Sequence, residues 1–209
     1  MRTLILFWFR RQAAKAAMHV LSPYFERSEI RDILRNYWQR YQVLKLEISQ
    51  MPTMGGTIMI HLSAMSTAFY EELISRGKSK EVTTQLFYDI AWKIYKKMGR
   101  LCWRLAGWSS LNSHSKLLNA TKLFRTFPFN SPSYLWSDVP ANDNVVGFDC
   151  LKCPVAEYFK VRGLSDFCAK TWCDLDYPLA NMWDAELKRT GSIAAGAKKC
   201  DFRWIVKKK

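Results

Sequence analysis

Hydrophobic residues recur at spacings of three and four through most of the first half of the chain. From Ile30 onward they form a single stripe, which predicts a long amphipathic helix. The members of this stripe are Ile30, Ile33, Leu34, Tyr37, Trp38, Tyr41 and Leu44. Pro52 and the pair Gly55-Gly56 interrupt the pattern, so the helix is expected to end before them.

Two further helices are predicted from the same periodicity. The first should run from about Thr57 to Arg76, with Gly77 closing it. Its expected inward side chains are Ile60, Met65, Phe69 and Leu73. The second should begin at the N-cap Ser79 and stop at Gly99. Its stripe is Val82, Leu86, Phe87, Ile90, Ile94 and Met98. We interpret all these stripes as core.

The hydrophobic pattern weakens between Ser109 and Asn144. Serines, asparagines and three prolines indicate loops there, with one short amphipathic piece near Leu117 to Phe124. We interpret this stretch as the connection between two halves of the protein, and expect it to form an aromatic flap. The side chains of that flap would be Phe127, Phe129, Tyr134 and Trp136.

The remainder of the chain mixes short helical and strand-like patterns. The expected elements are a strand at 145–148, helices at 154–159 and 178–187, and two strands of an antiparallel hairpin at 189–194 and 200–206. Pro154 suits the first turn of its helix, and the hairpin would turn across Gly196.

These patterns predict an α+β fold, with a helical N-terminal half packed on a C-terminal half that contains a small antiparallel sheet. At 209 residues the chain is long enough for one such domain. We therefore expect a single domain over 1–209. It would be mainly helical over 1–108, a loop-rich connection over 109–144 and a cysteine-rich α+β region over 145–206.

The formal net charge is +14, which raises the question of a nucleic-acid partner. The excess of basic residues is spread along the chain, and the dense run is confined to Lys207, Lys208 and Lys209. Proteins that bind nucleic acids usually concentrate their charge on one stripe or module, so this partner is disfavoured. A small molecule that bears a carboxylate is the expected partner instead.

The longest early apolar run, Thr3 to Phe9, is too short to span a bilayer, which needs roughly eighteen apolar residues. No later segment approaches that length, and no secretory signal is visible. A cytoplasmic protein without a transmembrane segment is expected, and a homo-oligomer is compatible with the sequence. The chain has six cysteines, five of them from Cys150 to Cys200, and we expect free thiols.

The cysteines are the first candidates for chemistry. Cys150 and Cys153 have the spacing of a metal-binding or redox pair, but Cys168 and Cys173 are too far apart for the second pair of a typical zinc site. No cofactor is required by the sequence, and a cysteine-bound metal would use Cys153, Cys173 and Cys200. Buried thiols that act as small hydrophobic groups are the alternative.

Cys153 stands directly before the helix predicted to begin at Pro154. The unpaired amides of that helix start would point toward its sulfur. Such a position lowers the pKa of a thiol and favours the nucleophilic thiolate. Cys153 is therefore the candidate nucleophile.

Two carboxylates, Asp174 and Asp176, are candidates for a general base, although N-capping is the alternative role of Asp176. Arg189 and Thr190 together would suit a substrate carboxylate, whereas an exposed strand arginine is the alternative. Strand alternation places Cys200 on the face opposite to Asp201.

His61 lies on the second predicted helix and is the candidate histidine, with a structural role as its alternative. The sequence has no Gly-x-Ser-x-Gly elbow that would indicate a serine triad, and no phosphate-binding or dinucleotide-binding loop.

An ordered set of motifs resembles the L-2-amino-thiazoline-4-carboxylic acid hydrolase family. The motifs are Cys-Pro at 153–154, Cys-x-x-Asp at 173–176, Arg-Thr at 189–190 and Gly-x-x-x-Cys-Asp-Phe at 196–202. The resemblance covers about 148–204. Upstream, Ala68 to Leu73 and the Arg76-Gly77 turn are similar to the helical half of the family.

The resemblance implies a hydrolase that opens a C–N bond of a cyclic amidine, such as a 2-aminothiazoline carboxylate, to give a carbamoyl amino acid. The roles that fit are Cys153 as nucleophile or metal ligand, Asp174 or Asp176 as base with His61 near them, and Arg189, Thr190, Cys200 and Asp201 around the substrate. The same C-terminal pattern also looks like small-ligand sensor domains of vinyl-reductase type. The alternative function is therefore a non-catalytic ligand-binding domain with a cysteine-lined pocket.

Overall fold

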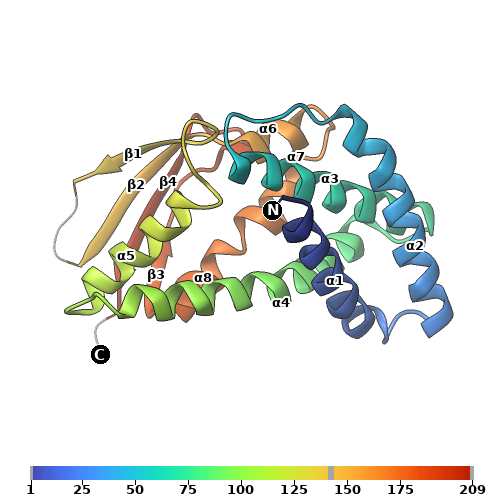
Figure 1. The fold of residues 1–209 in the computed structure, drawn as a ribbon, viewed down its shortest axis with the longest axis horizontal. Coiled ribbons are helices and arrows are strands. Elements are labelled where there is room, and N and C mark those ends of the chain that lie inside the picture. The colour runs from blue at the N-terminus through green and yellow to red at the C-terminus, as the bar shows by residue number, and fades with distance from the viewer. Residues whose placement is uncertain (1, 141–143, 208–209) are drawn as a thin grey trace.

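The structure is a computed structural model that describes residues 2–140 and 144–207, so that Lys208 and Lys209 of the basic run lie outside the described residues. Four helices build the N-terminal half: α1 (Arg2–Leu21), α2 (Arg27–Leu44), α3 (Met54–Ser75) and α4 (Lys80–Gly107). A short 3-10 turn, η1 (Lys45–Glu47), follows α2 directly. In Figure 1, α1, α2 and α3 gather at one end of the molecule and α4 runs from them to below the sheet.

The C-terminal half carries the sheet and several short helices. Its elements are α5 (Ser113–Thr126), β1 (Leu135–Val139), β2 (Val145–Lys152), α6 (Pro154–Lys160), α7 (Ser165–Cys168), the π-helical turn η2 (Ala169–Cys173), α8 (Asp176–Met182), β3 (Ala185–Lys188), the 3-10 turn η3 (Ile193–Ala195) and β4 (Cys200–Val206). The four strands are antiparallel in the order β1-β2-β4-β3. The predicted α+β class is confirmed.

Strand register sets which side chains face the helices. Phe148 on β2 lies opposite Phe202 on β4, and Cys150 lies opposite Cys200. All four side chains are buried, and α5 packs against β2 and β4 (Figure 1). Asp201 alternates to the other face, as the sequence predicted.

The predicted helix boundaries of the N-terminal half hold at most positions. The inward side chains expected on α3 are buried. Gly77 adopts φ +75 and its N–H donates to the Ile74 carbonyl, while the Lys78 N–H donates to that of Leu73. This is the hydrogen-bond pattern of a Schellman cap, which a glycine favours. Ser79 caps α4 by accepting from the Val82 N–H. The prediction that Val82 belongs to the core is wrong, since this residue in the first turn of α4 is 39% exposed.

The family-like segment around Glu72 has a structural explanation. Glu72 is buried on α3 and accepts hydrogen bonds from Arg40 on α2 at 3.0 Å and from Arg76 one turn later at 2.7 Å. Asn36 donates to the same carboxylate at 3.1 Å. A buried charge needs such partners, so this cluster fixes α2 against α3.

The prediction that Gly99 ends a helix is wrong, because α4 continues to Gly107. Gly99 is buried, and its carbonyl accepts a hydrogen bond from the Trp183 indole N–H at 3.0 Å. A Cβ atom at Gly99 would lie 2.4 Å from Leu179 Cδ1 and 2.6 Å from Met182 Cε. The glycine therefore permits α8 to pack closely on α4, a role that a helical sequence pattern does not distinguish from a stop.

Replacing Gly99 with valine is expected to lower the free energy of unfolding by about 1–3 kcal/mol, since the added methyl groups overpack this contact. Denaturant unfolding followed by circular dichroism measures the change. Gly107→Ala is the control on the same helix, because a Cβ there meets only the flexible Lys116 side chain. Equal stabilities of the two variants would contradict the packing argument.

Two C-terminal boundaries also differ from the predictions. The helix expected over 178–187 ends at Met182, and Ala185–Lys188 forms β3. The segment 189–194, expected as a strand, leaves the sheet. The physical reason is Asp201, whose carboxylate accepts hydrogen bonds from the backbone N–H groups of Thr190 and Gly191. These two N–H groups therefore cannot donate hydrogen bonds to a neighbouring strand.

Residues 109–144 contain more regular structure than loops alone. They include all of α5 and β1, of which β1 was not predicted. Among the described residues, no helix is both long and apolar enough to cross a membrane.

Candidate functional site

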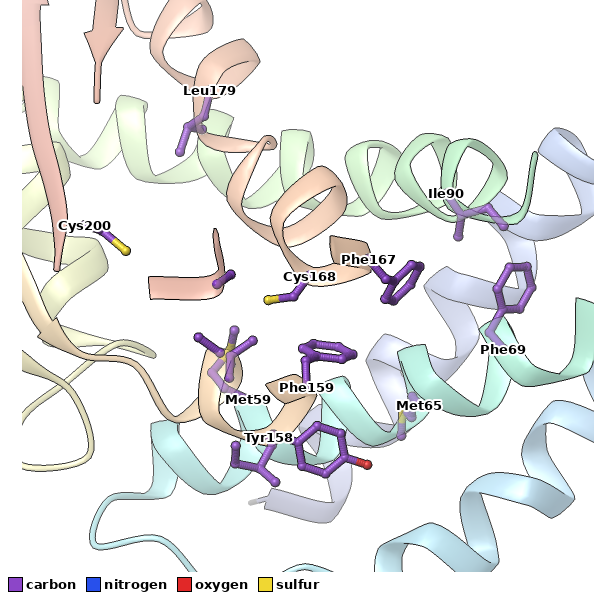
Figure 2. Close-up of a cluster of buried hydrophobic side chains, with 14 of the residues drawn as sticks. Met59, Met65, Phe69, Ile90, Tyr158, Phe159, Phe167, Cys168, Leu179 and Cys200 are labelled. Atoms are coloured by element: carbon purple, nitrogen blue, oxygen red, sulfur yellow. The ribbon is translucent and has the colours of Figure 1, made fainter. Parts of the chain in front are cut away.

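A cavity of about 260 Å³ lies between the helical half and the inner face of the sheet. Its wall is almost entirely apolar and comes from α1 to α5, the short C-terminal helices, and β1, β2 and β4. Figure 2 shows part of this wall, with Cys168 and Cys200 turning their sulfur atoms toward one another. Mostly apolar cavities with a few convergent polar groups are typical of small-molecule sites.

Five of the six cysteines line this cavity, and all six are free: Cys150, Cys153, Cys168, Cys173 and Cys200 are in the wall, and Cys102 is not. Cys168 and Cys173 are five residues apart in the sequence and come together because of the π-helical turn η2. The Asp174 N–H donates to the Ala169 carbonyl at 3.1 Å, an i to i+5 hydrogen bond. Such a turn brings side chains five residues apart to the same side of the helix.

Cys153 caps α6 as predicted, since its sulfur accepts a hydrogen bond from the Ala156 N–H at 3.5 Å. The expected lowering of its thiol pKa is wrong. Burial raises the pKa of Cys153 and outweighs the opposite effect of the Ala156 N–H. The six-residue remainder of α6 after Pro154 is a short helix, and its amides do not compensate for the loss of water around the sulfur.

The pKa of the Cys173 thiol is shifted in the opposite direction, below its ordinary value. The thiol of Cys168 donates a hydrogen bond to it and lowers the pKa of Cys173, and the nearby Arg189 guanidinium acts in the same direction against burial. The pKa of Cys168 is correspondingly raised, because this thiol keeps the shared proton. The structure therefore favours Cys173 as the thiolate of this cavity.

The charged residues of the wall are Asp176, Arg189 and Arg125, and the first two are in contact. Arg189 Nη1 lies 3.3 Å from Asp176 Oδ2, and Arg189 Nη2 donates to the Cys173 carbonyl at 3.4 Å. The Tyr95 hydroxyl on α4 donates to Asp176 Oδ1 at 3.4 Å. Burial raises the pKa of Asp176 to about 6, although Arg189 and Tyr95 oppose the rise. A carboxylate with such a pKa can exchange protons near neutral pH.

Four of the predicted site residues do not line the cavity. His61 does not line the cavity and forms a hydrogen bond with the Tyr41 hydroxyl of α2 through Nδ1 at 2.9 Å. Asp174 is half-exposed and borders an outer groove with Lys170, 3.9 Å from Arg189 at its nearest oxygen. Thr190 and Asp201 bind one another, with 2.7 Å between the Thr190 hydroxyl and Asp201 Oδ2.

The Thr190–Asp201 contact predicts a pH effect on stability. Against partial burial, the hydrogen bonds from Thr190 and Gly191 lower the pKa of Asp201 to about 2, below its unfolded value of roughly 3.9. A lowered folded pKa stabilises the protein fully above the unfolded pKa, and this contribution disappears as the pH falls through the folded pKa.

We therefore expect wild type to lose stability between about pH 4 and pH 2 more steeply than Asp201→Asn. Urea unfolding at several pH values measures this difference. Asp166→Asn is the control, since the Asp166 side chain is 78% exposed and pairs with Lys170 on the surface. Parallel curves for wild type and Asp201→Asn would contradict the assignment.

The metal site suggested for Cys153, Cys173 and Cys200 is not assembled. Within 2–140 and 144–207, no three histidine, cysteine, aspartate or glutamate side chains are grouped so that they could hold a metal ion. Cys200 Sγ instead accepts a hydrogen bond from the Ile193 N–H at 3.2 Å.

Several wall residues were missed by sequence reasoning. Tyr95 and Arg125 reach the cavity from α4 and α5, where the helical pattern gave no reason to single them out. The aromatic residues expected on a flap were a better guide, since Phe129, Tyr134 and Trp136 line the cavity. Phe127 does not line it and is 43% exposed.

Comparison with known proteins gave a family match and distant structural likenesses. The sequence profile of the L-2-amino-thiazoline-4-carboxylic acid hydrolase family matches residues 58–204. No curated protein matches the sequence. Among solved structures, the chain is similar to the Fe(II) unliganded H-NOX protein from K. algicida at 8% identity and a TM-score of 0.42, over 94% of this chain and 96% of that chain.

Proposed function

Because the chain belongs to the L-2-amino-thiazoline-4-carboxylic acid hydrolase family, we propose that it hydrolyses a small cyclic amidine that bears a carboxylate, opening the ring at its C–N bond. The family name supports a hydrolase in general, and the substrate and the bond are our proposal. The observation that carries it is the contact of Arg189 with both Asp176 and the Cys173 backbone at the wall of a buried cavity.

These groups match the charges of such a substrate. An amidinium ion presents two N–H groups side by side, which a carboxylate such as Asp176 accepts. A substrate carboxylate would pair with Arg189, whose side chain is only 5% exposed. The thiol with the lowered pKa, Cys173, belongs to the same charged wall. The proposal therefore replaces Cys153 with Cys173 as the nucleophile and keeps Asp176 as the base.

In the proposed reaction Asp176 takes the proton of the Cys173 thiol as the sulfur bonds to the amidine carbon, and passes this proton to the ring nitrogen. The ring C–N bond then breaks, and the nitrogen leaves as an amine with a second proton from the exocyclic amino group. Water adds to the remaining imine carbon. The bond to Cys173 breaks, the thiol is restored, and a carbamoyl product is released.

The test is incubation of the purified protein with 2-aminothiazoline-4-carboxylate and related cyclic amidines, with products identified by mass spectrometry and a thiol reagent. Breakage of the C–N bond predicts an S-carbamoyl product with a new amine and no new thiol. A new thiol would show that the ring C–S bond breaks instead. Absence of turnover across the panel, with and without added divalent metal, would contradict the hydrolase proposal.

One observation favours a second function, that of a non-catalytic ligand-binding domain. The cavity wall is almost entirely apolar, more than a small polar substrate requires. This alternative predicts saturable ligand binding that quenches tryptophan fluorescence without any product. Turnover that depends on Asp176 would exclude it.

A further inference from the structure

The cavity reaches well beyond its charged wall. From Cys200 on the sheet side its lining continues past Cys168 to Met65 and Phe69 on α3 and to Ile90 on α4, all labelled in Figure 2. It continues to α1 and α2, where its wall is formed by Phe9, Ala13, Ala17, Leu34 and Tyr37. A 2-aminothiazoline ring would occupy one part of this space and leave the α1 side without a partner.

The α1 side of the wall includes two small side chains, Ala13 and Ala17. Phe9, Ala13 and Ala17 are four residues apart, so they share one face of the helix. Two alanines on that face leave room that larger side chains would fill. Ala14 follows directly on the same helix and does not line the cavity.

The opposite side of the cavity has two buried N–H donors without an acceptor in the described part of the chain. Arg125 lies over Phe148 at 4.5 Å and Arg189 near Phe202 at 5.5 Å, and these two rings stack 5.2 Å apart. The Nε of Arg125 and the indole N–H of Trp204 are buried without a hydrogen-bond partner among the described residues. Arg125 pairs through Nη1 with Asp138 at 2.5 Å, and Arg189 pairs with Asp176 at 3.3 Å. The unpaired Arg125 Nε and the Trp204 indole are therefore the donors left for a ligand acceptor such as a carboxylate.

We propose that the substrate of this site is an amphiphile, with its carboxylate and amidine at the Arg189 and Arg125 side and an aliphatic body that extends to Ala13 and Ala17. This inference deepens the proposed function and rests on it for the amidine. The binding of a carboxylate with an apolar chain does not depend on turnover. The two can therefore be tested separately.

The experiment titrates butyrate, octanoate and dodecanoate into the whole protein below their aggregation concentrations, with tryptophan fluorescence as the readout. Trp136, Trp172 and Trp204 line the cavity and would report the ligand. We expect each added methylene to tighten binding by about three- to fourfold until the cavity is filled. Ala13→Leu should weaken dodecanoate binding by about tenfold or more and leave butyrate binding unchanged.

Ala14→Leu is the matched control and should bind all three acids as wild type does. Thermal unfolding checks the fold of each variant, and Ala13→Val provides a smaller change in the same direction. Affinity that does not increase with chain length, or equal effects of the Ala13 and Ala14 variants, would overturn the inference. If the protein hydrolyses the parent ring but binds the three acids with equal affinity, the amphiphile inference is contradicted and the hydrolase proposal is not. Chain-length-dependent binding without hydrolysis would contradict the proposed function alone.

Discussion

Replacing Asp176 with asparagine is expected to lower kcat/KM for the amidine substrate by about 10²–10⁴-fold, the usual contribution of a general base. Asparagine keeps the size of the side chain and one oxygen that can accept from Arg189, but it carries no charge and cannot take a proton. Steady-state kinetics with the ring-opening assay measures the loss. The neighbouring Asp174→Asn should lose far less activity, because Asp174 borders the outer groove.

The pH profile gives this assignment a readout that a structural role would not change. Since burial raises the pKa of Asp176 to about 6, kcat/KM should rise with pH through about 6 and level off above it. The sign follows from the role, because a base must be deprotonated before it acts. Asp166→Asn is the exposed control. A wild-type profile that is flat through this range, or an Asp176→Asn variant with normal rates, would contradict the role.

The second large effect is expected at Cys173. Cys173→Ser should lower kcat by about 10³-fold or more, as removal of a covalent nucleophile does in other enzymes. Cys153→Ser should retain most of the rate, because burial raises the pKa of the Cys153 thiol. Single-turnover kinetics and mass spectrometry of the quenched reaction would show an adduct on the Cys173 peptide in wild type.

Cys102→Ser is the matched control for removal of a thiol. Cys102 is buried on α4, donates to the Ala120 carbonyl at 3.4 Å and does not line the cavity. It should leave the rate unchanged. Cys173→Ala tests whether the serine variant fails for reasons of polarity. A full rate in both Cys173 variants would identify water as the nucleophile, and a loss confined to Cys153→Ser would restore the choice made from sequence.

The difference between Cys153 and Cys173 illustrates what a local motif can reveal. Cys153 was found because Pro154 indicates a helix start, and the structure places its sulfur at that N-terminus. Whether such a thiol ionises depends on how much water remains around it, which the motif does not encode. The lowered pKa of Cys173 comes from Cys168 and Arg189. The Arg189 contact joins segments that are not adjacent in sequence.

Most of the helix stripes, the caps at Gly77 and Ser79, and the α+β class could be predicted from the sequence, because periodicity and capping act within a few residues along the chain. The sequence also brought out the motif set that defines the family. The tertiary structure alone decided that Gly99 lies inside α4, that 189–194 leaves the sheet, and that Asp176, Arg189 and Tyr95 meet. The physical reason is that close packing, burial and pairing of charges depend on partners brought together by the fold, and no spacing along the chain specifies them.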